Sequence, residues 1–164
     1  MDVIWDELTS GLPDARQLIH VLIRLLAASL LGALVGAQRQ RAGKPAGLRT
    51  HMLVTLGTAV FVMACSGVGM SLEGQSRVIQ GIITGIGFIG AGSILKLNEE
   101  RDIQGLTTAA GVWMTAAIGV AVGLGSLGVA LLSTLFTLGI LSFAKQFEPS
   151  TDERRAAKSK VKDD

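Results

Sequence analysis

The stretch that decides the fold runs from residue 103 to residue 144 and reads IQGLTTAAGVWMTAAIGVAVGLGSLGVALLSTLFTLGILSFA. It has 42 residues and contains no Asp, Glu, Lys or Arg. An uncharged apolar run of about 18 residues or more indicates a membrane-spanning helix. As a single helix this stretch would be roughly 63 Å long, about twice the thickness of the hydrocarbon core. We therefore predict two helices joined by a hairpin at Gly123, Gly125, Ser126 and Gly128.

Two more uncharged runs precede it, one of 23 residues at 50–72 and one of 18 residues at 78–95. Together with an apolar segment near the start, they predict an all-α, polytopic transmembrane bundle of five helices. The expected spans are about 18–37, 51–70, 78–95, 105–123 and 126–144. The predicted organisation is an acidic outer N-terminal arm at 1–17, a transmembrane domain at 18–145, and a mixed-charge, disordered cytoplasmic tail at 146–164.

The basic residues set the expected orientation. The loops after the first and third spans and the C-terminal tail carry twelve Lys and Arg residues, whereas the opposite side carries only Arg16 and Arg77. Because basic loops stay in the cytoplasm, we predict the N-terminus outside and the C-terminus inside the cell. An odd number of spans, such as five, fits that orientation.

Several function classes are disfavoured by the sequence. The net charge of +2 does not indicate nucleic-acid binding, because the bases lie at the ends of apolar runs. No catalytic set of nucleophile and base is apparent, so we do not expect an enzyme or a cofactor. His20 and His51 lie at opposite ends of predicted spans, and no Asp or Glu lies within one. We therefore expect no metal site.

Residues 85–90 read GIGFIG, which matches the dinucleotide-binding fingerprint letter by letter. That fingerprint requires a turn between a strand and a helix, whereas these residues lie within a predicted span. Close helix packing is the better interpretation, and a kinked or broken helix lining a polar path is the alternative. The glycines concerned are Gly81, Gly85, Gly87, Gly90 and Gly92. Small residues four apart also predict packing faces at Gly32 and Gly36 and at Gly119 and Gly123.

Polar residues within the spans permit two interpretations. Thr107, Thr108 and Trp113 could extend a polar path, or each hydroxyl could bond to a carbonyl of its own helix. Arg24 is the only charged side chain well inside a predicted span. An intramembrane base suggests function by default, and pairing with Glu73 is a structural alternative.

The loop after the first span, QRQRAGKPAGLRT at 38–50, is the densest polar signal in the chain. Gly43 can end the first helix, and Pro45 prevents its continuation. The loop carries four bases and no acid. The candidate partner- or anion-binding residues are Arg39, Arg41, Lys44, Arg49 and Thr50. The plain alternative is that the bases only fix topology and contact anionic lipids.

Several segments taken together resemble the MgtC/SapB family of bacterial membrane proteins. The first is GALVG at 32–36 with Arg24 before it, and the second is GKPAGLRTHMLV at 43–54. The third is GIGFIGAG at 85–92, and the last is GLTTAA at 105–110 followed by Trp113 and AAIG at 116–119. They follow the family's order and cover residues 24–119.

The resemblance implies a five-helix protein of the bacterial inner membrane. The name-giving members are linked to growth at low magnesium and to survival inside macrophages, and they look like regulators rather than Mg²⁺ transporters. The resemblance also implies a membrane partner, such as the F-type ATP synthase or a transporter. Three departures matter. Gln38 and Gln40 replace glutamates, and the Asp expected before Arg77 is absent although Glu73 is close by. Longer members carry a folded cytoplasmic domain after the last span, where this sequence has residues 145–164.

We therefore expect a regulator of magnesium or ion homeostasis, or of membrane energetics, that acts through a membrane partner. A small channel or transporter for Mg²⁺ or another ion is the alternative, with its path along the third span. A homodimer formed through a glycine face is a further expectation.

Overall fold

The computed structural model describes residues 4, 14–96 and 103–147. It contains five helices, α2 to α6, and a two-stranded antiparallel ribbon. The helices are α2 (Ala15–Arg41), α3 (Leu48–Gly67), α4 (Leu72–Gly92), α5 (Leu106–Gly123) and α6 (Leu127–Phe147). The ribbon pairs β1 (Leu95–Lys96) with β2 (Ile103–Gln104). The prediction of five helices is confirmed, whereas the ribbon was not expected. Most of the predicted arm and tail lies outside the described residues.

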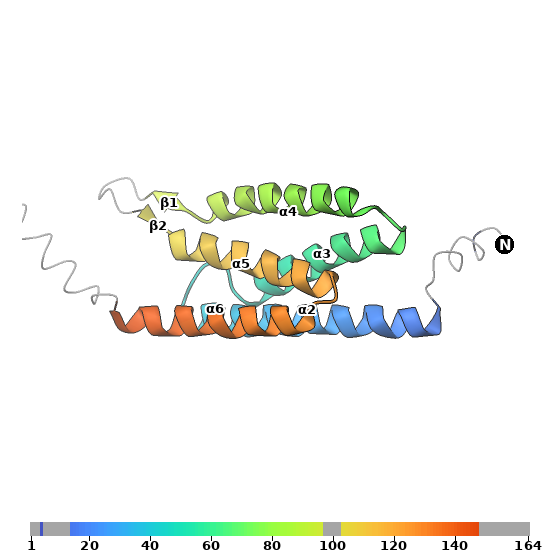
Figure 1. Ribbon diagram of the computed structural model, residues 1–164. Helices are drawn as coiled ribbons and strands as arrows, with labels where there is room; N and C mark the ends of the chain where they lie inside the picture. Colours follow the sequence, from blue (N-terminus) through green and yellow to red (C-terminus); the bar gives the residue numbers. More distant parts are fainter. Residues whose placement is uncertain (1–3, 5–13, 97–102, 148–164) are drawn as a thin grey trace, which may run out of the picture.

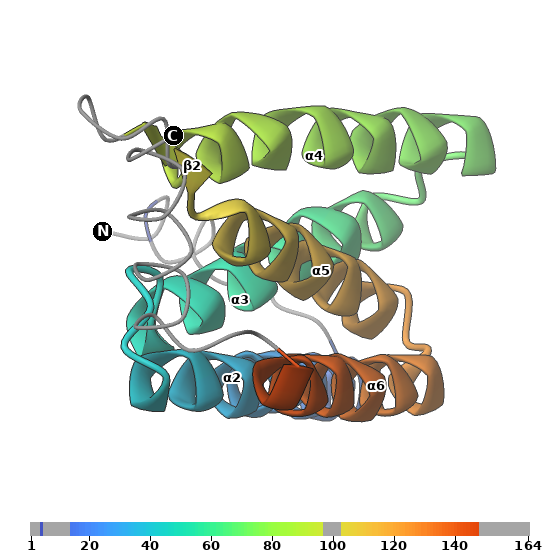
Figure 2. The same ribbon diagram turned by 90° about the vertical axis from the view of Figure 1, so that its left-hand side faces the viewer.

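The helices form three layers, with α4 on one side, α3 and α5 in the middle, and α2 and α6 on the other side (Figures 1 and 2). Their axes run in broadly the same direction (Figure 1). Helix α3 packs most extensively on α2 and α5, so it lies at the centre of the bundle. Helix α4 packs on α5 and, to a smaller extent, on α3.

Three helices end in the same way, at a glycine with positive φ. Gly43 (φ +66°), Gly69 (φ +67°) and Gly125 (φ +82°) follow the ends of α2, α3 and α5. At each end two backbone N–H groups bond back into the last turn, as in a Schellman motif. The predicted stop at Gly43 and the predicted hairpin after Gly123 are both confirmed.

Glycines allow α2 and α5 to approach α3 closely. A Cβ on Gly32 would lie 2.5 Å from Thr55 Oγ1, and a Cβ on Gly36 would lie 2.7 Å from Leu48 Cα. On α5, a Cβ on Gly123 would lie 2.7 Å from Val62 Cβ, and Gly119 is equally crowded against Thr58. Since no real side chain tolerates such distances, both predicted small-residue faces are confirmed as packing faces within the chain.

The glycines of α4 behave differently. Gly90 lies against Ala109, whereas Gly81, Gly85, Gly87 and Gly92 have no atom within 4 Å of where a Cβ would stand. Among the described residues, only Gly90 of the five lies against another helix, so helix packing at the other four stays a prediction. The structure also shows no break, because α4 is one continuous helix of 21 residues. Residues 85–90 lie within this helix and not at a strand–helix turn, so the nucleotide-binding interpretation fails as expected.

By length and composition, three of the described helices can cross a membrane, namely α2, α3 and α5. Helix α6 contributes a shorter apolar segment, Leu127–Phe143. Helix α4 starts six residues before the predicted span, so its first turns include the charged residues Glu73 and Arg77. Large apolar side chains are exposed on every helix, for example Leu30, Phe61, Phe88, Trp113 and Phe136. Such an outer surface is expected of a bundle whose solvent is lipid.

Candidate functional site

A buried polar cluster lies where the end of α2 meets the start of α5. Arg39, in the last turn of α2, is only 3% exposed. Its Nη2 donates a 3.1 Å hydrogen bond to Oγ1 of Thr108, which is in the first turn of α5 and is also buried. A buried guanidinium is costly unless it is hydrogen-bonded, so this contact fixes the position of α5 relative to α2.

His51 is the second buried polar residue at this end, and it is fully buried. Its Nδ1 lies 2.9 Å from the carbonyl oxygen of Gly47, one turn earlier on α3. A carbonyl can only accept, so Nδ1 carries the hydrogen and Nε2 is an acceptor. Nε2 is buried without a hydrogen-bond partner among the described residues. It faces Gly111 of α5, where a Cβ would lie 3.8 Å away.

Most threonine hydroxyls in the spans donate a hydrogen bond to a backbone carbonyl of their own helix. Thr55 donates to the carbonyl of His51, Thr58 to that of Val54, and Thr115 to that of Gly111, each at 2.8 Å. The plain interpretation of these hydroxyls is thereby confirmed. Thr108 differs because its hydroxyl oxygen accepts a bond from Arg39 of another helix.

Arg24 connects α2 to the α5–α6 corner. Its Nη1 donates a 2.9 Å hydrogen bond to the carbonyl oxygen of Gly123, the last residue of α5. A positive side chain at this position satisfies a free terminal carbonyl and interacts favourably with the helix dipole. The alternative in which Arg24 pairs with Glu73 is not found, because Glu73 pairs with Arg77 at 2.6 Å within α4.

The bases at the α2–α3 loop differ in their exposure to the surroundings. Arg39 is buried and donates to Thr108, and its binding of a partner or an anion stays a prediction. Arg41 and Lys44 are exposed beside the turn, Arg49 is exposed in the first turn of α3, and Thr50 is half-buried. The turn itself is held by Gln40, whose Oε1 accepts a bond from the backbone N–H of Leu48.

The residues proposed for a polar path do not gather along one line. Thr107 and Trp113 are exposed on α5, whereas Thr108 is buried and engaged by Arg39. The neighbouring α4 glycines, Gly90 excepted, are open to the outside of the chain. In the described residues, this part of the bundle therefore presents no continuous polar lining.

Two polar contributors were missed from the sequence. Gln38 donates from Nε2 to the carbonyl of Leu141 at 3.2 Å and ties α2 to α6. His51 was assigned only to the end of a span. The repeat of residues 51, 55, 58 and 62 at spacings of four and three would have placed His51 on the buried face of α3.

Within the described ranges, no group of three or more His, Cys, Asp or Glu side chains is placed to hold a metal ion. The polar chemistry of this part of the chain is therefore that of hydrogen bonds between helices and of exposed bases.

A bundle of long apolar helices with an apolar outer surface and small-residue interfaces defines a polytopic membrane protein. The comparisons with known proteins name the family. The model of the MgtC family matches residues 25–150, so the chain belongs to the MgtC family. No solved structure matches the chain.

Named relatives agree with this assignment. The chain is 44% identical to protein SrpB of Synechococcus elongatus over 76% of its own length and 75% of that protein. It is 46% identical to protein MgtC of Salmonella typhimurium over 71% of its own length and 49% of that protein. It is 40% identical to the "putative magnesium transporter YhiD" of Escherichia coli over 76% of its own length and 60% of that protein. The chain thus spans about half of the length of the Salmonella relative.

Proposed function

We propose that this chain is an inner-membrane regulator of magnesium or ion homeostasis, or of membrane energetics, that acts by binding a membrane protein partner. One observation carries the proposal. The buried Arg39 donates to Thr108 and the half-buried Arg24 donates to Gly123, whereas Arg41 and Lys44 are exposed beside the α2–α3 turn. Exposed bases that make no hydrogen bond or ion pair with the described residues suit the recognition of an acidic partner.

The distribution of carboxylates favours regulation over transport. Sites for hard cations such as Mg²⁺ are built from oxygen ligands, usually including carboxylates. Glu73 is the one carboxylate within the described helices, and it is exposed and paired with Arg77.

The proposal includes the orientation and number of spans. All five helices cross the inner membrane, with α4 and α6 beside the three longer apolar helices. The α2–α3 turn and the C-terminus are cytoplasmic because of the excess of bases on that side. The family resemblance makes the F-type ATP synthase or a transporter the first partner to test. No catalytic step is part of this function.

The second candidate is a small channel or transporter for Mg²⁺. The Escherichia coli relative is named a putative magnesium transporter, which favours this candidate. Its path would follow α4, where four glycines are open. A dye that reports Mg²⁺ inside proteoliposomes, with an imposed gradient, separates the two candidates. Saturable flux above that of empty liposomes, abolished by Gly87→Leu, would establish transport and overturn the regulator.

The docking surface is tested by charge reversal. We expect the double variant Arg41→Glu/Lys44→Glu to insert normally and to lose the ability to restore growth of a deletion strain at limiting magnesium. The control is Arg16→Glu, which reverses an exposed base at the opposite end of α2. Full growth of the first variant, with insertion shown by protease access to the tail, would refute docking at this turn.

A further inference from the structure

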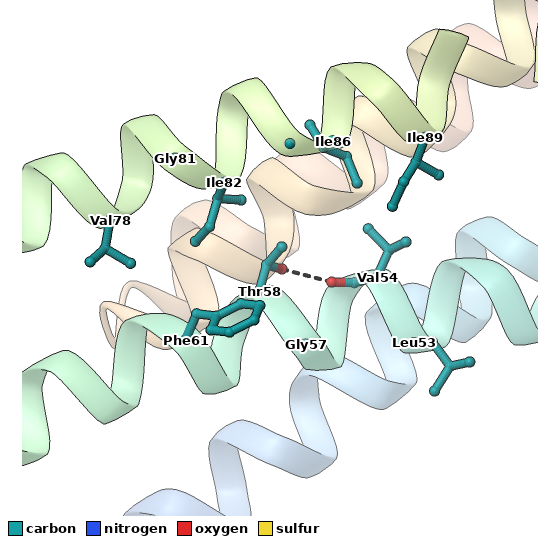
Figure 3. A pocket seen from close by; sticks show the side chains of 11 residues that line it. Leu53, Val54, Gly57, Thr58, Phe61, Val78, Gly81, Ile82, Ile86 and Ile89 are labelled. Atoms are coloured by element: carbon teal, nitrogen blue, oxygen red, sulfur yellow. Dashed lines mark hydrogen bonds between the residues drawn. The ribbon is translucent and has the colours of Figure 1, made fainter. Parts of the chain in front are cut away.

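A groove runs along the outside of the bundle between α3 and α4 (Figure 3). Its volume is about 640 Å³. The lining is apolar along almost its whole length, and Thr58, the polar side chain in it, donates its hydrogen to Val54 of its own helix. The wall on α3 includes Leu53, Gly57 and Phe61, and the wall on α4 includes Gly81, Gly85 and Ile89.

Glycines create the groove. Gly57 on α3 and Gly81 and Gly85 on α4 each have no atom within 4 Å of where a Cβ would stand. Glycine costs helix stability relative to alanine, by about 1 kcal/mol in a helix interior. Where such glycines bring two helices together, as Gly36 and Gly119 do, close packing offsets that cost. The three groove glycines gain no such contact within the chain.

The length of the groove matches one leaflet of a bilayer. On α4 it extends from Val78 to Ile89, twelve residues, or about 17 Å at 1.5 Å per residue. Half of the hydrocarbon core is about 15 Å thick. An acyl chain lying along the groove would therefore be covered over most of its length.

Charge distinguishes the two ends of the groove. At the Val78 end the adjacent base, Arg77, is neutralised by Glu73. At the other end Arg49 lies one helical turn beyond Leu53 on the same face of α3, since residues four apart are neighbours on a helix. The Arg49 side chain is exposed and has no hydrogen-bond or ion-pair partner among the described residues.

We infer that the α3–α4 groove binds an anionic phospholipid of the bilayer, with an acyl chain between Gly57 and Gly81 and the headgroup phosphate on Arg49. The apolar trough and the exposed Arg49 at one mouth match the acyl chain and the phosphate of such a lipid. The occupant follows from charge complementarity at this mouth and from the length of the trough. Its base, Arg49, is in the first turn of α3, whereas the proposed docking bases Arg41 and Lys44 lie beside the α2–α3 turn, so the inference does not rest on the proposed function.

Native mass spectrometry of the full chain in detergent, with phosphatidylglycerol or phosphatidylethanolamine added, tests the inference. We expect one phosphatidylglycerol to remain on each chain, with much weaker retention of phosphatidylethanolamine. Gly57→Leu should abolish retention by filling the groove. Arg49→Gln should lower the preference for phosphatidylglycerol roughly fivefold, the effect of about one base near an anionic surface.

Two matched variants serve as controls. Gly87→Leu adds the same side chain on α4 outside the groove, and Arg41→Gln removes an exposed base beside the turn, so both should retain the lipid. Unchanged retention in Gly57→Leu, or equal retention of the two lipids by the wild type, would overturn the inference. A dimer that dissociates on Gly57→Leu without loss of lipid would assign the groove to a second copy instead.

Discussion

The guanidinium of Arg39 in the last turn of α2 donates a 3.1 Å hydrogen bond to Oγ1 of Thr108 in the first turn of α5, 69 residues further along the chain. Both residues are buried, so the bond forms away from water, where an unpaired partner is expensive. This contact links the loop after the first span to the start of the fourth.

Thr108→Val removes the acceptor while keeping the shape of the side chain. We expect a loss of about 1–3 kcal/mol in the free energy of unfolding, because Arg39 would lose one of its buried partners. Thr107→Val is the matched control, since Thr107 is exposed on the same helix, and it should change stability by less than about 0.5 kcal/mol. Unfolding in mixed micelles, followed by circular dichroism, measures both. Equal stability of the two variants would show that the Arg39–Thr108 bond contributes little.

Gly119→Ala tests the close approach of α3 and α5. A Cβ at this position would collide with Thr58 Oγ1 and with backbone atoms of Thr55, which cannot easily move. We expect destabilisation by about 1–3 kcal/mol, as in other overpacked cores. Gly87→Ala has free space around the new methyl group and should be neutral or slightly stabilising, since alanine favours the helix. Thermal unfolding in detergent compares them, and a stable Gly119→Ala variant would contradict this packing.

Arg24→Met tests whether the intramembrane base has a structural role. Methionine keeps much of the apolar stem but cannot donate to the carbonyl of Gly123, so the end of α5 loses its partner. We expect a loss of about 1–3 kcal/mol, typical of a hydrogen bond from a charged group. The exposed Arg16 on the same helix provides the control Arg16→Met. Should Arg24→Met lose activity with unchanged stability, the functional interpretation of this base would be favoured instead.

The helices could be predicted well from the sequence because long uncharged apolar runs indicate membrane-spanning helices. Residues 103–144 required a hairpin by length alone, and the structure places it at Gly125 as expected. Helix α4 was harder to delimit. Its first two turns are polar, so hydropathy placed its start at residue 78 instead of Leu72. An exposed Glu73–Arg77 pair allows the helix to begin in a polar setting.

The polar contacts were predicted less well, because residue type does not reveal the partner. Arg39, Arg41 and Arg49 look alike in the sequence, yet only Arg39 lies on the buried face of α2, where Val35 and Gly36 precede it. Glycine is ambiguous in the same way. Gly36 is crowded by Leu48, whereas Gly85 borders an open groove. The burial of an arginine and the crowding of a glycine depend on which helix packs against that residue, and this is set by the tertiary structure.

Labelling of introduced cysteines tests the proposed orientation in the membrane. Cys65 is the only native cysteine, so Cys65→Ala gives a background without thiols. We expect Ser71→Cys, at the exposed α3–α4 corner, to react with a membrane-impermeant maleimide in intact spheroplasts. Lys44→Cys, at the exposed α2–α3 turn, should react only after permeabilisation, because the basic loops are expected in the cytoplasm. The reverse pattern would place the bases outside the cell, where they could not meet a cytoplasmic partner.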